Sequence, residues 1–122
     1  MKIYIMRHGQ AGMNAKTDEQ RPLTEQGIEE SIHMAGWLAP QLTGSLSLVI
    51  HSNYLRARQT WQAISAELPE ALKVEESGEI TPYGDPAFVA SYLTALAATH
   101  DNILMGSHLP LVGYLVQSLC PA

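Results

Sequence analysis

Short apolar runs alternate along the chain with longer segments of helical periodicity. The short runs contain many β-branched residues and predict buried strands at 2–6, 45–50 and 102–106. A more polar run near Val74 is compatible with a further strand. The longer segments predict a helix after each strand, at 24–38, 53–68, 86–98 and 110–119. This order predicts an α/β fold of three layers, with helices on both faces of a mainly parallel central sheet.

Apolar spacing within the helical segments predicts which face of each helix is buried. The stripe expected to face the core in the first helix is Ile28, Ile32, Ala35 and Leu38. Thr24 stands where a residue can cap this helix, and Pro40 and Gly44 mark its end. In the second helix the corresponding stripe is Ala57, Trp61, Ile64 and Leu68.

Polar residues stand at the predicted ends of three strands. The carboxyl ends of parallel strands form the edge of a sheet where ligands bind. The residues that the chain delivers to this edge include Arg7, His8, Gly9, His51, Ser52, Arg56, Ser107 and His108. We expect His51 to be a packing residue. Two arginines and two histidines therefore converge there, and neither helical periodicity nor strand alternation requires them.

This combination of residue types has a definite chemical meaning. Guanidinium groups such as those of Arg7 and Arg56 bind phosphate oxygens bidentately. A neutral imidazole is a good nucleophile at phosphorus, and a second imidazole can donate a hydrogen bond to the anion. Gly9 allows a sharp turn and the close approach of a ligand. The pattern predicts a phosphate-binding pocket that contains a nucleophile.

Composition narrows the class of protein. Lys and Arg number 7 against 12 Asp and Glu, a net charge of −5, which argues against nucleic acid as the main partner. The single cysteine, Cys120, excludes an internal disulfide framework and fits a reducing compartment. No apolar run has the length of a signal peptide or a membrane span. We expect residues 1–122 to form a single cytoplasmic domain that does not associate with membranes.

Five motifs together resemble the histidine phosphatases, the phosphoglycerate mutase-like superfamily, and in particular its compact SixA-type phosphohistidine phosphatases. They are "IMRHG" (5–9), "RPLTEQG" (21–27), "SNYLRARQT" (52–60), "EITPYGD" (79–85) and "GSHLPLVGYLV" (106–116). The resemblance extends over essentially the whole length. It departs at Asn53, where the family usually has proline, and at the end "LCPA", beyond which compact relatives add strands. The resemblance implies a histidine phosphatase domain shortened at its C-terminus, with the C-terminal strand region missing.

The resemblance also implies roles for individual residues. His8 matches the histidine that becomes phosphorylated, and the residues that match the surroundings of the transferred phosphate are Arg7, Arg56 and His108. Gly9 and Asn14 complete the predicted phosphate-binding set. Glu79 and Asp18 are the candidates for a general acid, although Glu79 lies one residue farther from Gly84 than the family spacing.

The function implied is that of a phosphohistidine phosphatase in signal transduction, acting on a histidine-containing phosphotransfer domain through a phospho-His8 intermediate. No cofactor or metal is expected, because the carboxylates lack ligand spacing and the arginines supply positive charge. Two alternatives stay open: a small-molecule phosphomonoesterase or mutase of the same superfamily, and a non-catalytic module that binds phosphate or phosphohistidine. The sequence leaves open the oligomeric state, the identity of the phosphoprotein and the imidazole nitrogen that carries its phosphate.

Overall fold

The computed structural model describes residues 2–42 and 44–119, so that Cys120 lies outside the described residues. The strands are β1 (Lys2–Arg7), β2 (Leu48–Ser52), β3 (Val74–Ser77) and β4 (Asn102–Ser107). The helices are α1 (Glu25–Leu38), α2 (Leu55–Ile64), α3 (Pro86–Ala97) and α4 (Leu111–Leu119). Short 3₁₀ turns lie at η1 (Asp18–Gln20), η2 (Ala39–Gln41) and η3 (Ser65–Glu67).

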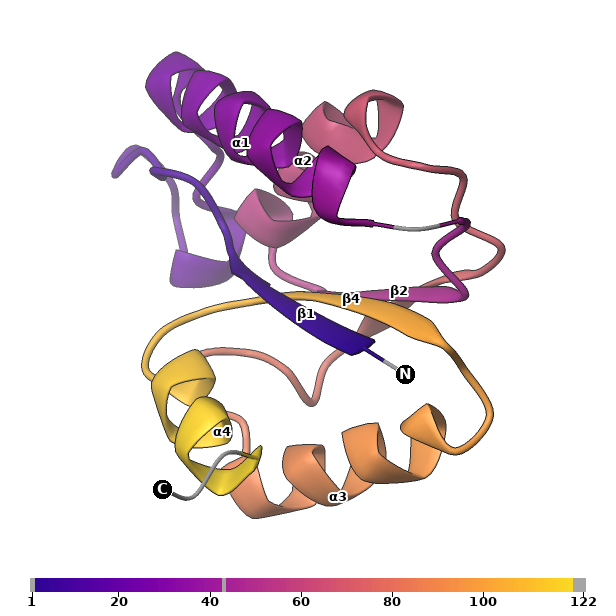
Figure 1. Ribbon diagram of the computed structural model, residues 1–122. Coiled ribbons are helices and arrows are strands. Elements are labelled where there is room, and N and C mark those ends of the chain that lie inside the picture. The colour runs from indigo at the N-terminus through magenta and orange to yellow at the C-terminus, as the bar shows by residue number, and fades with distance from the viewer. Residues whose placement is uncertain (1, 43, 120–122) are drawn as a thin grey trace.

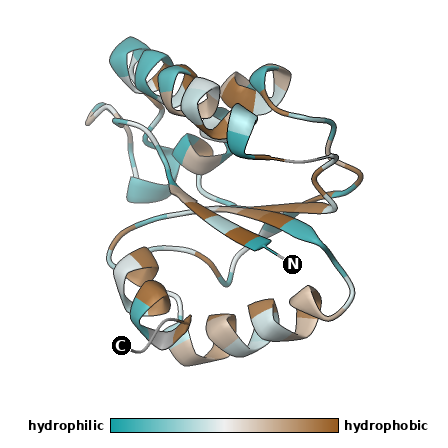
Figure 2. Ribbon diagram, viewed as in Figure 1, coloured by the Kyte–Doolittle hydropathy of each residue, from teal (hydrophilic) through white to brown (hydrophobic). Residues whose placement is uncertain are grey.

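The strands form one parallel sheet in the order β1-β4-β2-β3. Helices α1 and α2 cover one face of this sheet, and α3 and α4 cover the other (Figure 1). The strands contribute to a core on both faces: Val49 and Leu104 pack toward α1 and α2, whereas Ile103 and Met105 pack toward α3 and α4. Accordingly, β1, β2 and β4 contain hydrophobic segments, whereas much of α1 is hydrophilic (Figure 2). The predicted three-layer parallel fold is confirmed, and so is the strand near Val74.

Two elements differ from the predicted ones at both their start and their end. The strand predicted at 45–50 begins at Leu48 and continues to Ser52, because pairing with β4 starts at Leu48 and pairing with β3 continues as far as Ser52. The helix predicted at 53–68 begins only at Leu55 and becomes a 3₁₀ turn after Ile64. The Asn53 N–H donates to the Ser77 carbonyl (3.2 Å), which keeps the chain extended along β3 for one more residue.

The predicted core face of α1 is wrong at two positions. Ile28 and Ile32 are each 38% exposed, and the buried residues of α1 are Gly27, Ser31, Ala35 and Leu38. The cause is close approach between α1 and the segment after β1. A Cβ atom at Gly9 would lie 2.4 Å from the Gly27 carbonyl oxygen and 2.7 Å from Ser31 Oγ. Only small residues fit at positions 27 and 31, so Ile28 and Ile32 lie on the flank of the helix.

The Gly27→Ala variant is expected to lose about 3 kcal/mol of unfolding free energy, because the new Cβ would lie 2.2 Å from the Gln10 carbonyl oxygen. Urea unfolding at pH 7 measures the change. Gly36→Ala, in the same helix, is the control: its Cβ would have no neighbour within 4 Å, and helix propensity favours alanine by up to about 1 kcal/mol. Equal stability of the two variants would contradict the close packing described above.

β1 lies at one edge of the described sheet, where its hydrogen-bonded neighbour is β4. An apolar groove of about 690 Å³ runs along this edge, lined by Ile3, Ile5, Thr94, Ala97, Ala98, Val116 and Leu119. An uncovered edge of this kind can accept a further strand. Within residues 2–42 and 44–119, no helix has both the length and the hydrophobicity needed to cross a membrane.

Candidate active site

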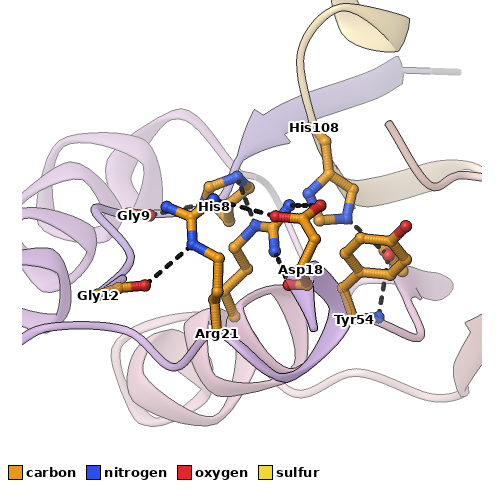
Figure 3. Close-up of polar contacts among 9 residues, drawn as sticks. His8, Gly9, Gly12, Asp18, Arg21, Tyr54 and His108 are labelled. Carbon is orange, nitrogen blue, oxygen red and sulfur yellow. Dashed lines mark hydrogen bonds and ion pairs between the residues drawn. The ribbon is translucent and has the colours of Figure 1, made fainter. Parts of the chain in front are cut away.

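The carboxyl ends of three strands place the candidate residues together. His8 directly follows β1, Ser52 ends β2 with Arg56 in the first turn of α2, and His108 directly follows β4. The segment between β1 and α1 folds back over this edge and brings Asp18 and Arg21 beside the histidines (Figure 3). The site therefore lies between the carboxyl ends of β1, β2 and β4 and the long loop that joins β1 to α1.

Hydrogen bonds on both ring nitrogens fix the state of His8. Its Nδ1 lies 2.6 Å from the Gly9 carbonyl oxygen, which can only accept, so Nδ1 carries the proton. The Arg56 Nε–H, which can only donate, lies 3.2 Å from Nε2. Burial lowers the pKa of His8 below its ordinary value of 6.5, and nearby arginine charges lower it further against the opposing Gly9 bond. The ring is therefore neutral near pH 7, and the lone pair of Nε2 accepts the hydrogen bond from Arg56.

Arg56 is a buried cation with a fixed orientation. Only 4% of the residue is exposed. Its Nη1 donates to the Asp18 carbonyl oxygen (2.6 Å) and its Nη2 to Asp18 Oδ2 (3.2 Å), in addition to the bond from Nε to His8. The guanidinium carbon lies 4.9 Å from the centre of the Tyr54 ring, at the distance of a cation–π contact. The positive charge is thus held directly beside Nε2 of His8.

His108 is completely buried beside His8, with 4.9 Å between the ring centres. Its Nε2 lies 2.7 Å from Ser52 Oγ, and Tyr54 packs against its ring. Burial, followed by the charges of His8 and Arg56, lowers the pKa of His108 from 6.5 to about 3. Its Nδ1 has no hydrogen-bond partner among residues 2–42 and 44–119. Within the described residues, this nitrogen is therefore a buried polar atom whose hydrogen-bonding capacity is unsatisfied.

Side chains of α2 hold the loop segments in place. The Thr60 hydroxyl oxygen accepts the Gly9 N–H (3.2 Å), and Gln59 Oε1 accepts the Leu23 N–H (2.8 Å). Farther along, Thr24 caps α1 by accepting the Gly27 N–H, as the sequence predicts. The motif at 52–60 therefore serves both to supply Arg56 and to anchor the two ends of the loop beside His8.

Asp18 and Arg21 form an ion pair that reaches Arg56. Arg21 Nη1 donates to Asp18 Oδ1 (3.0 Å), and Arg21 Nε donates to the Gly12 carbonyl oxygen (2.9 Å). The other carboxylate oxygen accepts from Arg56. Partial burial raises the pKa of Asp18, but the hydrogen bonds and charges of the two arginines outweigh this effect and lower it below 3.8. The carboxyl group is ionised at neutral pH.

Comparison with known proteins identifies the family. Residues 3–80 match the model of the histidine phosphatase superfamily (branch 1). The chain belongs to this superfamily. It is 44% identical to the Phosphohistidine phosphatase SixA of Escherichia coli (strain K12), over 99% of this chain and 75% of that protein. A homologue of SixA in Haemophilus influenzae is 38% identical, over 98% of this chain and 77% of that protein.

Solved structures agree with this family assignment. The structure of the protein histidine phosphatase SixA complexed with tungstate matches this histidine phosphatase with a TM-score of 0.93 and 44% identity. The match covers 100% of this chain and 78% of the solved chain. The fold and the family predicted from the motifs are therefore confirmed.

The structure of this histidine phosphatase brings only some of the predicted site residues together. His8, Gly9, Arg56 and His108 lie in one cluster. Arg7, at the end of β1, is exposed and lines a cleft of about 730 Å³ together with His8 and Arg21. This cleft is the open approach to His8.

Two predicted residues lie apart from the cluster. Asn14 is exposed on the loop between β1 and α1, and Glu79 is exposed directly after β3. Within residues 2–42 and 44–119, the side chain of neither residue has a hydrogen-bond partner. His51 is buried with Nδ1 3.0 Å from the Ser52 carbonyl oxygen, in agreement with its predicted packing role. No group of three or more His, Cys, Asp or Glu residues in the described ranges is arranged to hold a metal ion.

Sequence reasoning did not single out Arg21, Tyr54 or the contact from Ser52 to His108. Arg21 belongs to the "RPLTEQG" motif, which was the only available signal that it had a role. Tyr54 follows the position that departs from the family pattern, and nothing in its spacing indicated that its ring would contact both His108 and Arg56. The contacts of Tyr54 and Ser52 with His108 join residues that are distant in the sequence and are brought together only by the folded sheet.

Acidification is expected to destabilise the protein through His108. Its pKa is about 3 in the folded state and 6.5 ordinarily, so below pH 6.5 the unfolded chain binds a proton that the folded chain does not. Unfolding free energy should fall by about 2 kcal/mol between pH 7 and pH 5 from this group alone. Urea unfolding of His108→Gln should show a pH dependence smaller by that amount. An unchanged pH dependence would contradict the neutral, buried state of His108.

Proposed function

We propose that this histidine phosphatase removes the phosphoryl group from a phosphohistidine on another protein, through a phospho-His8 intermediate. The observation that carries the proposal is the state of His8: a neutral ring with its Nε2 lone pair beside the buried Arg56 guanidinium. The 44% identity to phosphohistidine phosphatase SixA along 99% of the chain supports the same reaction.

The proposed reaction has two steps. In the first, Nε2 of His8 attacks phosphorus, the bond between Nε2 and phosphorus forms, and the bond to the imidazole nitrogen of the substrate breaks. In the second, water attacks phosphorus, the bond to His8 breaks and returns its electron pair to Nε2, and the proton that the water loses leaves with inorganic phosphate. Arg7, Arg56 and His108 are the groups that we assign to the phosphoryl oxygens. Catalysis then rests on positioning and on stabilisation of the negative charge spread over those oxygens.

The available proton donors favour an imidazole leaving group. An alkoxide leaves poorly and needs a positioned general acid, whereas a protonated imidazole needs little help. Asp18 is ionised by its arginine partners and therefore cannot donate a proton, and Glu79 is exposed outside the cluster. A phosphohistidine thus suits this site better than a phosphate ester does.

The partner that we propose is a histidine-containing phosphotransfer domain in a cytoplasmic signalling pathway. Such a domain presents its phosphohistidine on a helix surface, and the open cleft of about 730 Å³ beside His8, Arg7 and Arg21 gives it access. A phosphohistidine carried by a folded protein can reach His8 only if the cleft beside His8 is open to solvent.

Comparison of two substrates tests the proposal. The ratio of kcat/KM for a phosphohistidine-bearing phosphotransfer domain to that for p-nitrophenyl phosphate is expected to exceed about 10². A preference for the ester would favour a small-molecule phosphomonoesterase instead. Binding of phosphate with no turnover of either substrate would favour a binding module.

A further inference from the structure

The Asp18 carboxylate occupies the arginines that face the nucleophile. Oδ1 accepts from Arg21 and Oδ2 accepts from Arg56, with N–O distances of 3.0 and 3.2 Å. Arg56 also donates from its other nitrogens, from Nη1 to the Asp18 carbonyl and from Nε to His8, so that three of its five N–H groups are engaged. In this arrangement all three nitrogens of the guanidinium closest to Nε2 are already engaged, two of them by the same aspartate.

A phosphoryl group and the Asp18 carboxylate compete for the same donors. Both are anions that bind guanidinium nitrogens through paired oxygens. A phosphoryl group within reach of His8 Nε2 lies next to Arg56 Nε, where it competes with Asp18 Oδ2 for Arg56 Nη2. The Asp18 side chain is 41% exposed, whereas only 5% of the Arg56 side chain is. The exposed partner, which has room to be displaced, is therefore the anion, and the buried partner is the cation.

The charges around His8 indicate that Asp18 limits how tightly the site holds phosphate. Arg7, Arg21 and Arg56 bring three positive charges to the edge of the sheet, and Asp18 neutralises one of them. Three uncompensated guanidinium groups would hold a phosphate dianion tightly, and the same dianion is the product that has to leave. A carboxylate that returns to Arg56 helps to expel it.

We propose that Asp18 is a positioning residue that acts as an internal counter-ion: the phosphoryl group displaces it from Arg56, and its return weakens the binding of inorganic phosphate. The inference rests on the proposed function only in assigning a phosphoryl group as the ligand. In this role Asp18 acts as an ionised carboxylate and not as a proton donor.

Calorimetric titration with inorganic phosphate at pH 7.5 tests this role without using activity. Asp18→Asn is expected to bind phosphate about tenfold more tightly than the wild type, because the amide keeps the size of the side chain but removes its charge. Asp18→Glu, which restores the carboxylate, is expected to return the affinity to within about threefold of the wild type. Thermal melting of each variant shows that it is folded.

Glu19→Gln is the matched control. Glu19 is exposed in the same 3₁₀ turn, and its replacement changes the net charge by the same amount. Its phosphate affinity is expected to stay within about twofold of the wild type. Three results would overturn the proposal. Asp18→Asn could bind phosphate no more tightly than the wild type, or Glu19→Gln could gain as much phosphate affinity as Asp18→Asn. The third is that neither the wild type nor Asp18→Asn binds phosphate. Tighter binding in Asp18→Asn without hydrolysis by the wild type would instead refute only the proposed function.

Discussion

The His8→Ala variant is expected to lose at least about 10⁴-fold in the rate of phosphate removal from a phosphohistidine domain, while its fold is retained. Removing the nucleophile of a covalent mechanism leaves only binding and charge stabilisation to act on the substrate. The geometry gives the reason for a loss this large. Of the two nitrogens of the His8 ring, Nε2 faces Arg56 and Nδ1 is bonded to Gly9.

A control for this variant comes from the same chain. His33 is exposed on α1, and His33→Ala is expected to keep the wild-type rate within about twofold. Single-turnover measurements with enzyme in excess isolate the chemical step. A His8→Ala rate within tenfold of the wild type would show that the phosphoryl group passes directly to water, and the proposed intermediate would have to be abandoned.

The Arg56→Lys variant is expected to lose about 10³-fold in kcat although it keeps the positive charge. Arginines that bind a transferred phosphoryl group contribute on the order of 10³- to 10⁵-fold in related chemistry. Arg56 donates from all three nitrogens in fixed directions, to His8 and to Asp18, and its guanidinium lies over the Tyr54 ring. A single ammonium group cannot reproduce this planar arrangement.

Arg58→Lys is the matched control, because Arg58 lies in the same helix and its ion pair with Glu76 is exposed. It is expected to change kcat by less than twofold. Thermal melting of both variants separates a catalytic loss from unfolding. If Arg56→Lys and Arg58→Lys had the same kcat, Arg56 would have only a structural role.

Much of the fold could be predicted because the strands are short, apolar and followed by turn residues. The segments at 2–6 and 102–106 lie within β1 and β4, and helices beginning at Pro86 and near Pro110 follow the predicted order. His8, Arg56 and His108 could be assigned to one edge because parallel strands place their carboxyl ends together. The apolar pattern locates the strand ends, and the parallel topology places those ends at one edge of the sheet.

The buried face of α1 could not be predicted from its apolar residues. Periodicity favours Ile28 and Ile32, but the contact of α1 with the segment after β1 is made at Gly27 and Ser31. A glycine carries no hydrophobic signal, so a face that is buried because it is small is invisible to a count of apolar positions.

The ion pairs of Asp18 and Arg21 could not be predicted either. They lie in the long segment between β1 and α1, which has no helical or strand periodicity. Its path depends on hydrogen bonds with residues distant in sequence: the Leu23 N–H donates to Gln59, and Arg56 donates to the Asp18 carbonyl, with sequence separations of 36 and 38 residues. Long loops of this kind are positioned by the rest of the fold.

The measurement that most directly tests the central claim is rapid-quench detection of phosphate on the enzyme. The wild type, in excess and in the presence of EDTA, is mixed with a phosphotransfer domain that carries radioactive phosphohistidine. We expect transient label on the enzyme that is stable to base and labile to acid, that maps to His8 and that is absent from His8→Ala. Release of inorganic phosphate with no label on the enzyme, or label at any residue other than His8, would contradict the account.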